Sequence, residues 1–219
     1  MKKESNVEWW EKTLENLPKS YADWFNEEKK FLKRHIIANS KVLEVGCGEG
    51  RSLRYIQDIT QKITGIDNDP KAIGDAKGNI KNGKFLIVDG KRLPFENNLF
   101  DFILCMTTPA NFGNEKQKIY SEMKRIVKDN RQILLSVFNE DAMKERLKLY
   151  KKVNAPVKKI VGERVVFEKY VDVEFSEQFS KEELEEIFKE AGLNILSIEK
   201  IGIGYFCRLN KSCVNKLYV

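Results

Sequence analysis

Along most of the chain, segments with the apolar pattern of a strand alternate with segments that have the apolar period of a helix. Short apolar runs, typical of buried strands, occupy 41–46, 62–67, 84–88, 100–106 and 131–138. Segments with an apolar residue at every third or fourth position, typical of amphipathic helices, occupy 50–59, 70–79 and 114–128. Alternating strands and helices predict a parallel sheet that is covered by helices on both faces.

The two ends of the chain depart from this alternation. Residues 7–17 and 21–38 predict two amphipathic helices before the first strand, joined at Pro18-Lys19-Ser20. After Asn139 the pattern predicts further elements, which are a helix over 142–153, a hairpin of strands 157–162 and 164–175, a helix over 180–191 and two closing strands, the last at about 204–209.

These patterns predict three parts of the chain. Residues 1–38 form an N-terminal helical cap, and residues 39–139 with 180–219 form the α/β core. Residues 140–179 form an insertion that leaves the core after its fifth strand. Loops at the carboxyl ends of parallel strands form binding crevices, so we expect the insertion to be a substrate lid. A hairpin that extends the sheet or makes a dimer contact is the alternative.

Residues 41–50 carry the strongest chemical signal, Lys-Val-Leu-Glu-Val-Gly-Cys-Gly-Glu-Gly. An apolar strand runs into three glycines, which allow a ligand to lie against the main chain. A dinucleotide fingerprint would place its third glycine at Arg51, so a pyrophosphate ligand is disfavoured. The negative charge of Glu44 instead favours a ligand with a cationic amino group.

This segment resembles the first motif of the class I S-adenosylmethionine-dependent methyltransferases, E-x-G-x-G-x-G, at Glu44, Gly46, Gly48 and Gly50. Three later segments are similar to further motifs of the family. They are 62–67, which ends in an acid 23 residues beyond Glu44, 85–90 with Leu93-Pro94-Phe95 after it, and 98–105 with its Phe-Asp pair. The resemblance covers about residues 38–138.

The resemblance implies a Rossmann-like, doubly wound, mostly parallel seven-stranded sheet with an antiparallel last strand. It also implies S-adenosylmethionine as cofactor, with S-adenosylhomocysteine as product. In the family, the acid at Asp67 binds the ribose hydroxyls and the acid at Asp89 contacts the adenine amino group. The expected cofactor-binding residues are Glu44, Gly46, Cys47, Gly48, Gly50, Asp67, Asn68, Asp89, Gly90, Cys105 and Tyr21.

Several of these residues have a second interpretation. Asp67 is also placed to cap the helix that follows it, and the glycines could form an ordinary tight turn. Tyr21 lies in an aromatic segment, 21–25, similar to one that covers the methionine end of the cofactor in the family. Aromatic residues at helical spacing are also typical of a core, which we favour for Trp9, Trp10 and Trp24. Arg51 is expected to start a helix and to matter little.

The end of the fourth predicted strand offers candidate acceptor-binding residues. Thr107, Thr108 and Asn111 could hold an acceptor by hydrogen bonds or could cap the next helix. The segment lacks the [DNS]-P-P-[FYW] motif of enzymes that methylate base or glutamine nitrogens, and Cys105 lacks the P-C loop of cytosine C5 enzymes. We therefore expect methyl transfer to N or O of a small molecule, with no catalytic base identified.

Composition leaves two other functions open. The chain of 219 residues carries a net charge of +6, with lysine doublets at 151–152 and 158–159. A methyltransferase of tRNA, rRNA or protein is one alternative, and it predicts that these lysines border the cleft. The second alternative is a non-catalytic cofactor-binding subunit.

The same counts bear on metal binding and location. A single His35 and four cysteines without a C-x-x-C pair suggest no metal site. The absence of a long apolar run or signal sequence predicts a cytoplasmic protein without membrane contact.

Overall fold

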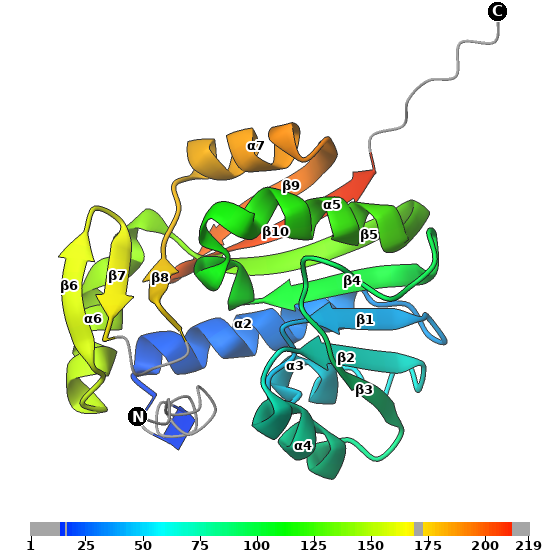
Figure 1. Ribbon diagram of the computed structural model, residues 1–219, viewed down its shortest axis with the longest axis horizontal. Coiled ribbons are helices and arrows are strands. Elements are labelled where there is room, and N and C mark those ends of the chain that lie inside the picture. The colour runs from blue at the N-terminus through cyan, green and yellow to red at the C-terminus, as the bar shows by residue number, and fades with distance from the viewer. Residues whose placement is uncertain (1–13, 16, 169–172, 212–219) are drawn as a thin grey trace, which may run out of the picture.

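The computed structural model describes residues 14–15, 17–168 and 173–211. Its core is a seven-stranded sheet with strand order β3-β2-β1-β4-β5-β10-β9 (Figure 1). The strands are β1 Val42–Val45, β2 Ile63–Asp67, β3 Gly83–Ile87, β4 Phe100–Met106, β5 Val127–Phe138, β9 Leu193–Ile201 and β10 Gly204–Lys211. The first five pair in parallel, and β10 runs antiparallel to β5 and β9. The predicted Rossmann-like fold is confirmed.

Helices cover both faces of this sheet. On one face α2 Lys19–His35, α3 Arg51–Arg54 and α4 Pro70–Asn79 pack on side chains such as Leu104 and Phe206. On the other, α5 Lys116–Ile126 and α7 Lys181–Glu190 pack on side chains such as Leu135. Alternate residues of each central strand therefore belong to different apolar clusters, as expected for a sheet buried on both sides.

One helix of the core is shorter than predicted, and one predicted helix is not tested. The helix predicted over 50–59 ends at Arg54, because the chain then tightens into turns with i to i+3 hydrogen bonds, such as Ile56 N to Leu53 O at 3.2 Å. These turns bury Ile56 in the same cluster as Leu53. The helix predicted over 7–17 lies almost wholly outside the described residues.

The insertion after β5 forms a small α/β unit beside the sheet (Figure 1). It contains η3 Glu140–Ala142, α6 Met143–Lys152 and an antiparallel sheet of β6 Val157–Val161, β7 Arg164–Phe167 and β8 Phe175–Glu177. The prediction of one continuous strand over 164–175 is wrong. The chain reverses after Phe167, so that β8 pairs with the free edge of β7.

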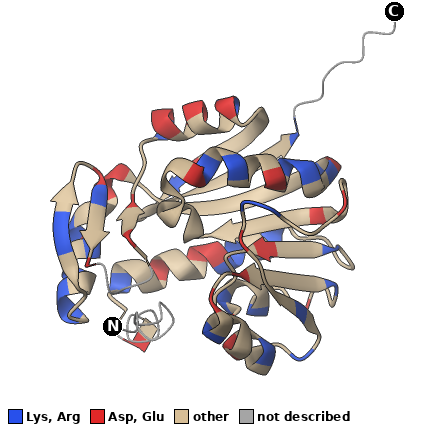
Figure 2. Ribbon diagram, in the orientation of Figure 1, with Lys and Arg blue, Asp and Glu red and all other residues tan. Residues whose placement is uncertain are grey.

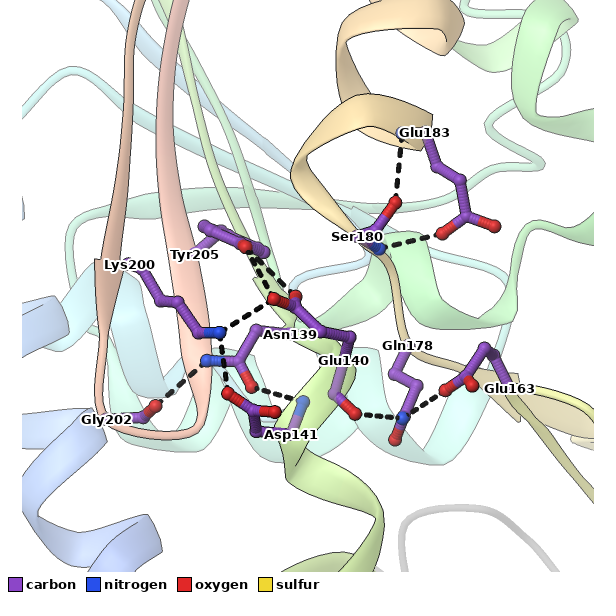
Figure 3. Close-up of polar contacts among 10 residues, drawn as sticks. All are labelled: Asn139, Glu140, Asp141, Glu163, Gln178, Ser180, Glu183, Lys200, Gly202 and Tyr205. Carbon is purple, nitrogen blue, oxygen red and sulfur yellow. Dashed lines mark hydrogen bonds and ion pairs between the residues drawn. The ribbon is translucent and has the colours of Figure 1, made fainter.

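The two ends of the insertion meet at the end of β5. The Phe179 N–H donates to Phe138 O at 3.0 Å, and Asn139 Nδ2 donates to Gly202 O at 2.9 Å. Figure 3 shows that Gln178 Nε2 also donates to the backbone oxygen of Glu140, at 2.7 Å. The insertion is therefore fixed to the core by both of its ends.

Within the described residues, no helix is long and apolar enough to cross a membrane.

Candidate functional site

A cavity of about 620 Å³ lies at the carboxyl ends of the parallel strands. One part, which we call the strand-end half, is lined by residues 44–49, 66–69 and 88–91. The other part, the insertion half, is lined by Tyr21 of α2, Phe138 of β5 and residues of the insertion, namely Leu149, Tyr150, Arg164, Phe167 and 173–176. Residues 106–108 and Asn111, which follow β4, also line the cavity.

The glycine loop borders the strand-end half with its backbone. Gly46 has a φ of 72°, and a Cβ there would lie 2.3 Å from Thr108 Cγ2. Gly48 has a φ of 52°, and a Cβ there would meet no atom of the described residues within 4 Å. The Gly46 site is therefore closed by protein, whereas the main chain at Gly48 faces open space that a ligand can occupy.

Asp67 holds this loop from the end of β2. Its Oδ2 accepts a hydrogen bond from the Gly48 N–H at 2.9 Å, and its Oδ1 accepts one from the Asp69 N–H at 3.0 Å. Burial raises the pKa of Asp67, although both backbone hydrogen bonds oppose the shift. The helix after β2 is capped by Asp69, whose carboxylate accepts from Lys71 N, so Asp67 is not its cap.

Glu44 is a buried acid, 1% exposed, beneath the loop. The Ser52 hydroxyl donates to Glu44 Oε1, but Oε2 has no hydrogen-bond partner among the described residues. Burial raises the pKa of Glu44 to about 8. A buried carboxylate oxygen without a donor is costly, so it can bind a cationic or N–H group of a ligand.

Asp89 and Gly90 lie just beyond β3 and complete the strand-end half. Asp89 Oδ1 accepts from the Lys91 N–H at 2.9 Å, and Asp89 Oδ2 lies 3.1 Å from Lys91 Nζ. Burial alone would raise the pKa of Asp89, but the contacts to Lys91 outweigh it, and the pKa lies below its usual value. This carboxylate stays ionised and acts as a hydrogen-bond acceptor. Cys47 and Asn68 line the same half.

Thr107 joins the two halves in a strained conformation. Its φ is 68°, unusual for a β-branched residue, and its N–H is held by Ser136 O at 2.9 Å and Ser136 Oγ at 3.0 Å. Thr107 Oγ1 is buried without a partner among the described residues. Thr108 to Asn111 form a 3-10 turn, and neither the turn at Gly113–Glu115 nor α5 has a side-chain cap, so the alternative capping role is not observed. Thr107, Thr108 and Asn111 all line the cavity.

Tyr21 lies in the insertion half, and its side chain is 1% exposed. Its ring packs on Phe138 with the ring centroids 5.9 Å apart. The Tyr21 hydroxyl has no hydrogen-bond partner in the described part of the chain, and burial raises the pKa of this phenol well above its usual value. Tyr21 therefore remains a protonated donor. Trp24 is a core residue, whereas Trp9 and Trp10 lie outside the described residues.

Two residues expected at the site do not line the cavity. Gly50 precedes α3 with a φ of 85°, and a Cβ there would lie 2.8 Å from Ile80 Cδ1, so this glycine lets the loop before α3 pack against the end of α4. Cys105 is buried on the opposite face of β4, with residues that pack under α5. Because side chains alternate along a strand, Met106 faces the cavity in its place.

Arg51 was expected to start a helix and to matter little. It does start α3, but its guanidinium lies 2.5 Å from Glu28 Oε1 and 4.0 Å from the centre of the Phe25 ring. The side chains of Arg51 and Glu28 are 12% and 0% exposed. Glu28 also accepts from Ser136 Oγ at 2.8 Å. Glu28 lies among the apolar residues of α2, and an acid in such a position indicates in the sequence alone that a buried cationic partner is present.

The insertion supplies residues that no motif indicated. Tyr150, Phe167 and Phe175 line the cavity with rings, and Arg146 contacts the rings of Tyr150 and Phe138. The lysine doublets occupy α6 and β6, where Figure 2 shows a concentration of basic residues. Neither doublet lines the cavity, which among the described residues has seven acids and three basic side chains in its lining.

Comparison with known proteins assigns the family. A family model described as a methyltransferase domain matches residues 36–192, well over half of the chain. The chain belongs to this methyltransferase family. A solved structure of a SAM-dependent methyltransferase of Methanosarcina mazei superposes with a TM-score of 0.63, at 18% identity over 83% of this chain and 96% of that one. The protein is accordingly a class I methyltransferase that uses S-adenosylmethionine.

Two further proteins are similar to this methyltransferase in amino-acid sequence. An uncharacterised protein of Methanocaldococcus jannaschii is 28% identical over 83% of this chain and 95% of its own length. A demethylmenaquinone methyltransferase of Thermotoga maritima is 26% identical over 58% of each chain.

The residues of the strand-end half fit the cofactor of the methyltransferase. Glu44 Oε2 is a buried acceptor that no donor of the described residues reaches, so it can bind the cofactor's cationic amino group. The main chain at Gly48 borders open space in which a nucleoside can lie.

Proposed function

We propose that this methyltransferase transfers the methyl group of S-adenosylmethionine to N or O of a small molecule bound in the insertion half. The observation that carries the proposal is the aromatic lining of this half. Phe138, Tyr150, Phe167 and Phe175 line it, and α2 and the insertion cover it. Such walls suit a small apolar or aromatic acceptor. The similar Thermotoga maritima enzyme is likewise named for a small molecule, demethylmenaquinone.

The cofactor is proposed to occupy the strand-end half. Glu44 would bind its amino group, the backbone of 46–48 would lie along its methionine part, and Asp67 would accept from the ribose hydroxyls. Asp89 and Gly90 would contact the adenine. Cys47 and Asn68 would border the cofactor, and Tyr21 would lie where its methyl end meets the acceptor. Gly50 and Cys105 are left out because the cavity does not reach them.

The chemistry needs positioning more than proton transfer. When bound, S-adenosylmethionine supplies an electrophilic methyl group on a sulfonium. The protein's own residues would align the acceptor and exclude water, which supplies most of the rate in such displacements. Burial raises the pKa of the Cys47 and Cys105 thiols, so neither is an available base. Thr107, Thr108 and Asn111 are proposed to hold the acceptor at the end of β4.

A methyltransferase of RNA or protein is less well supported by the site. That function predicted lysines around the cleft, but the doublets at 151–152 and 158–159 do not line the cavity. The lining is instead mainly acidic, which opposes a phosphate backbone.

The test is transfer of labelled methyl from S-adenosylmethionine into an extract of source cells, followed by filtration. We expect the label in the small-molecule filtrate. Label retained by nuclease-sensitive or protease-sensitive material would contradict the proposal. Binding of S-adenosylhomocysteine without transfer to any fraction would instead indicate the non-catalytic subunit.

A further inference from the structure

Arg146 is a fully buried cation on α6, with 0% exposure. Its Nη1 donates to Gln178 Oε1 at 3.1 Å, and its Nη2 donates to Ser176 O at 2.7 Å and to the Tyr150 hydroxyl at 3.4 Å. Arg146 Nε has no partner among the described residues. Among the described residues, every acceptor that the guanidinium contacts is therefore neutral.

This charge lacks the compensation that a buried cation ordinarily has. Arg146 forms no salt bridge with a carboxylate of the described residues; the nearest acid along its hydrogen bonds is Glu163, reached through Gln178. Its neighbour Glu145 is turned to Ser20 and Lys148. An unpaired buried charge costs several kcal/mol, so a site that keeps one is suited to bind an anion.

The guanidinium lies directly behind the wall of the insertion half. Three of the four residues that it contacts, Phe138, Tyr150 and Ser176, line the cavity. Its centre is 4.7 Å from the centre of the Phe138 ring. Tyr21 packs on the same ring, and its hydroxyl has no hydrogen-bond partner among the described residues. The wall therefore presents a neutral hydrogen-bond donor with a positive charge behind it.

We propose that the insertion half binds the methyl acceptor as an oxygen anion on a flat ring, a phenolate or an enolate. The Tyr21 hydroxyl donates to the anionic oxygen, and Arg146 acts as a positioning residue whose charge favours the ionised form. The inference rests on the proposed function, because it specifies the acceptor of the same cavity. It favours oxygen over nitrogen, since a neutral amine gains nothing from a nearby cation.

The test measures binding of a matched pair of probes to the full chain saturated with S-adenosylhomocysteine, so that no turnover occurs. The probes are 4-nitrophenol, at a pH where it is ionised, and its neutral methyl ether 4-nitroanisole. We expect the wild type to bind the phenolate at least about tenfold more tightly than the ether. Binding should also shift the absorbance band of the phenolate, which reports its electrostatic surroundings.

Three variants separate the electrostatic role of Arg146 from a structural one. Arg146→Met should weaken phenolate binding about tenfold and leave ether binding unchanged, while Arg146→Lys should restore part of the preference. Tyr21→Phe keeps the ring packing and should also reduce the preference, so the proposal stays testable if Arg146→Met fails to fold. Arg131→Met, at a partly exposed arginine paired with Asp101, is the control and should change neither affinity.

Three results would overturn the proposal. The first is a wild type that fails to bind the phenolate or binds both probes equally. The second is an Arg146→Met protein that loses affinity for both probes alike, which would indicate packing. The third is loss of S-adenosylhomocysteine affinity in this variant with the phenolate unaffected, because the cation would then serve the cofactor carboxylate. A wild type that does not bind S-adenosylhomocysteine would refute the proposed function itself, a separate result.

Discussion

The two halves of the cavity are built in different ways. The strand-end half comes from three short segments, 44–49, 66–69 and 88–91, each at the end of one parallel strand. The insertion half joins residues far apart in the sequence, including Tyr21, Phe138, Tyr150 and Phe175. The donor part of the site therefore depends on backbone geometry that short motifs specify, whereas the acceptor part depends on tertiary packing.

The halves also differ in charge. The strand-end half contains the acids Glu44, Asp67 and Asp89, which suit the amino group and hydroxyls of a nucleoside. The insertion half has a buried arginine behind aromatic rings. A cation-binding half beside an anion-binding half suits a reaction in which a positively charged donor meets an electron-rich acceptor.

The largest expected effect on ligand affinity concerns Asp67. Asp67→Ala should weaken S-adenosylhomocysteine binding about 100-fold, because it removes both the ribose acceptor and the hydrogen bond that fixes the Gly48 N–H. Calorimetric titration measures this, with urea unfolding to show that the fold persists. Asp58→Ala, at an exposed acid paired with Lys33, is the matched control. Equal affinities of the wild type and Asp67→Ala for S-adenosylhomocysteine would show that the cofactor does not bind in the strand-end half.

Substitution of Arg51 tests whether its ion pair with Glu28 of α2 stabilises the fold. Arg51→Met leaves the buried Glu28 carboxylate without its ion pair, so we expect about 3 kcal/mol loss in the free energy of unfolding. Arg54→Met is the control, since its pair with Glu49 is more exposed and should contribute less than about 1 kcal/mol. Similar losses in both variants would show that burial of the Arg51 pair has no consequence.

Glu44 predicts a pH dependence of stability. Its pKa is 4.5 when unfolded and about 8 when folded, so the folded state favours the protonated acid. Stability from this group is complete below about pH 4.5 and is lost as the pH rises toward 8. Glu44→Gln lacks this loss of stability, so its free energy of unfolding should rise by roughly 3 kcal/mol relative to the wild type between about pH 5 and pH 8.

Urea unfolding of both proteins at the two ends of that range measures the difference. A constant difference across the range would mean that Glu44 is ionised throughout. S-adenosylhomocysteine should reduce the pH dependence, because its amino group stabilises the carboxylate.

The contrast between the halves explains how far the sequence could predict this molecule. The pattern of apolar residues predicted seven strands and placed six of them near their observed positions, since a parallel sheet buried on both faces leaves a local pattern. The first closing strand, β9, was predicted without bounds, and β5 begins at Val127 rather than at 131. Most of the residues expected at the cofactor site do line the cavity. Cys105 does not, because motif matching ignores which face of a strand a side chain takes.

The insertion was less predictable for a physical reason. The division of 164–175 into β7 and β8 depends on pairing between strand edges, which apolar alternation does not determine. Arg146 has the sequence surroundings of an exposed helical arginine, Lys-Glu-Arg-Leu-Lys. Its burial results from contacts with Phe138, Ser176 and Gln178, and these partners are visible only in the folded structure.

The smallest expected effect concerns the outer side of the insertion. Lys158 and Lys159 lie on β6 with exposed side chains, and Lys158 has just a distant contact with Glu168, at 3.9 Å. The double variant Lys158→Glu, Lys159→Glu should leave S-adenosylhomocysteine affinity and methyl transfer to the filtrate unchanged, because these charges are solvated and absent from the cavity lining. RNA binding of both proteins, measured over a series of salt concentrations, completes the test. If the wild type binds RNA with a salt-dependent affinity and the double variant does not, the acceptor site lies on the outer side of the insertion. RNA would then be the favoured acceptor over a small molecule.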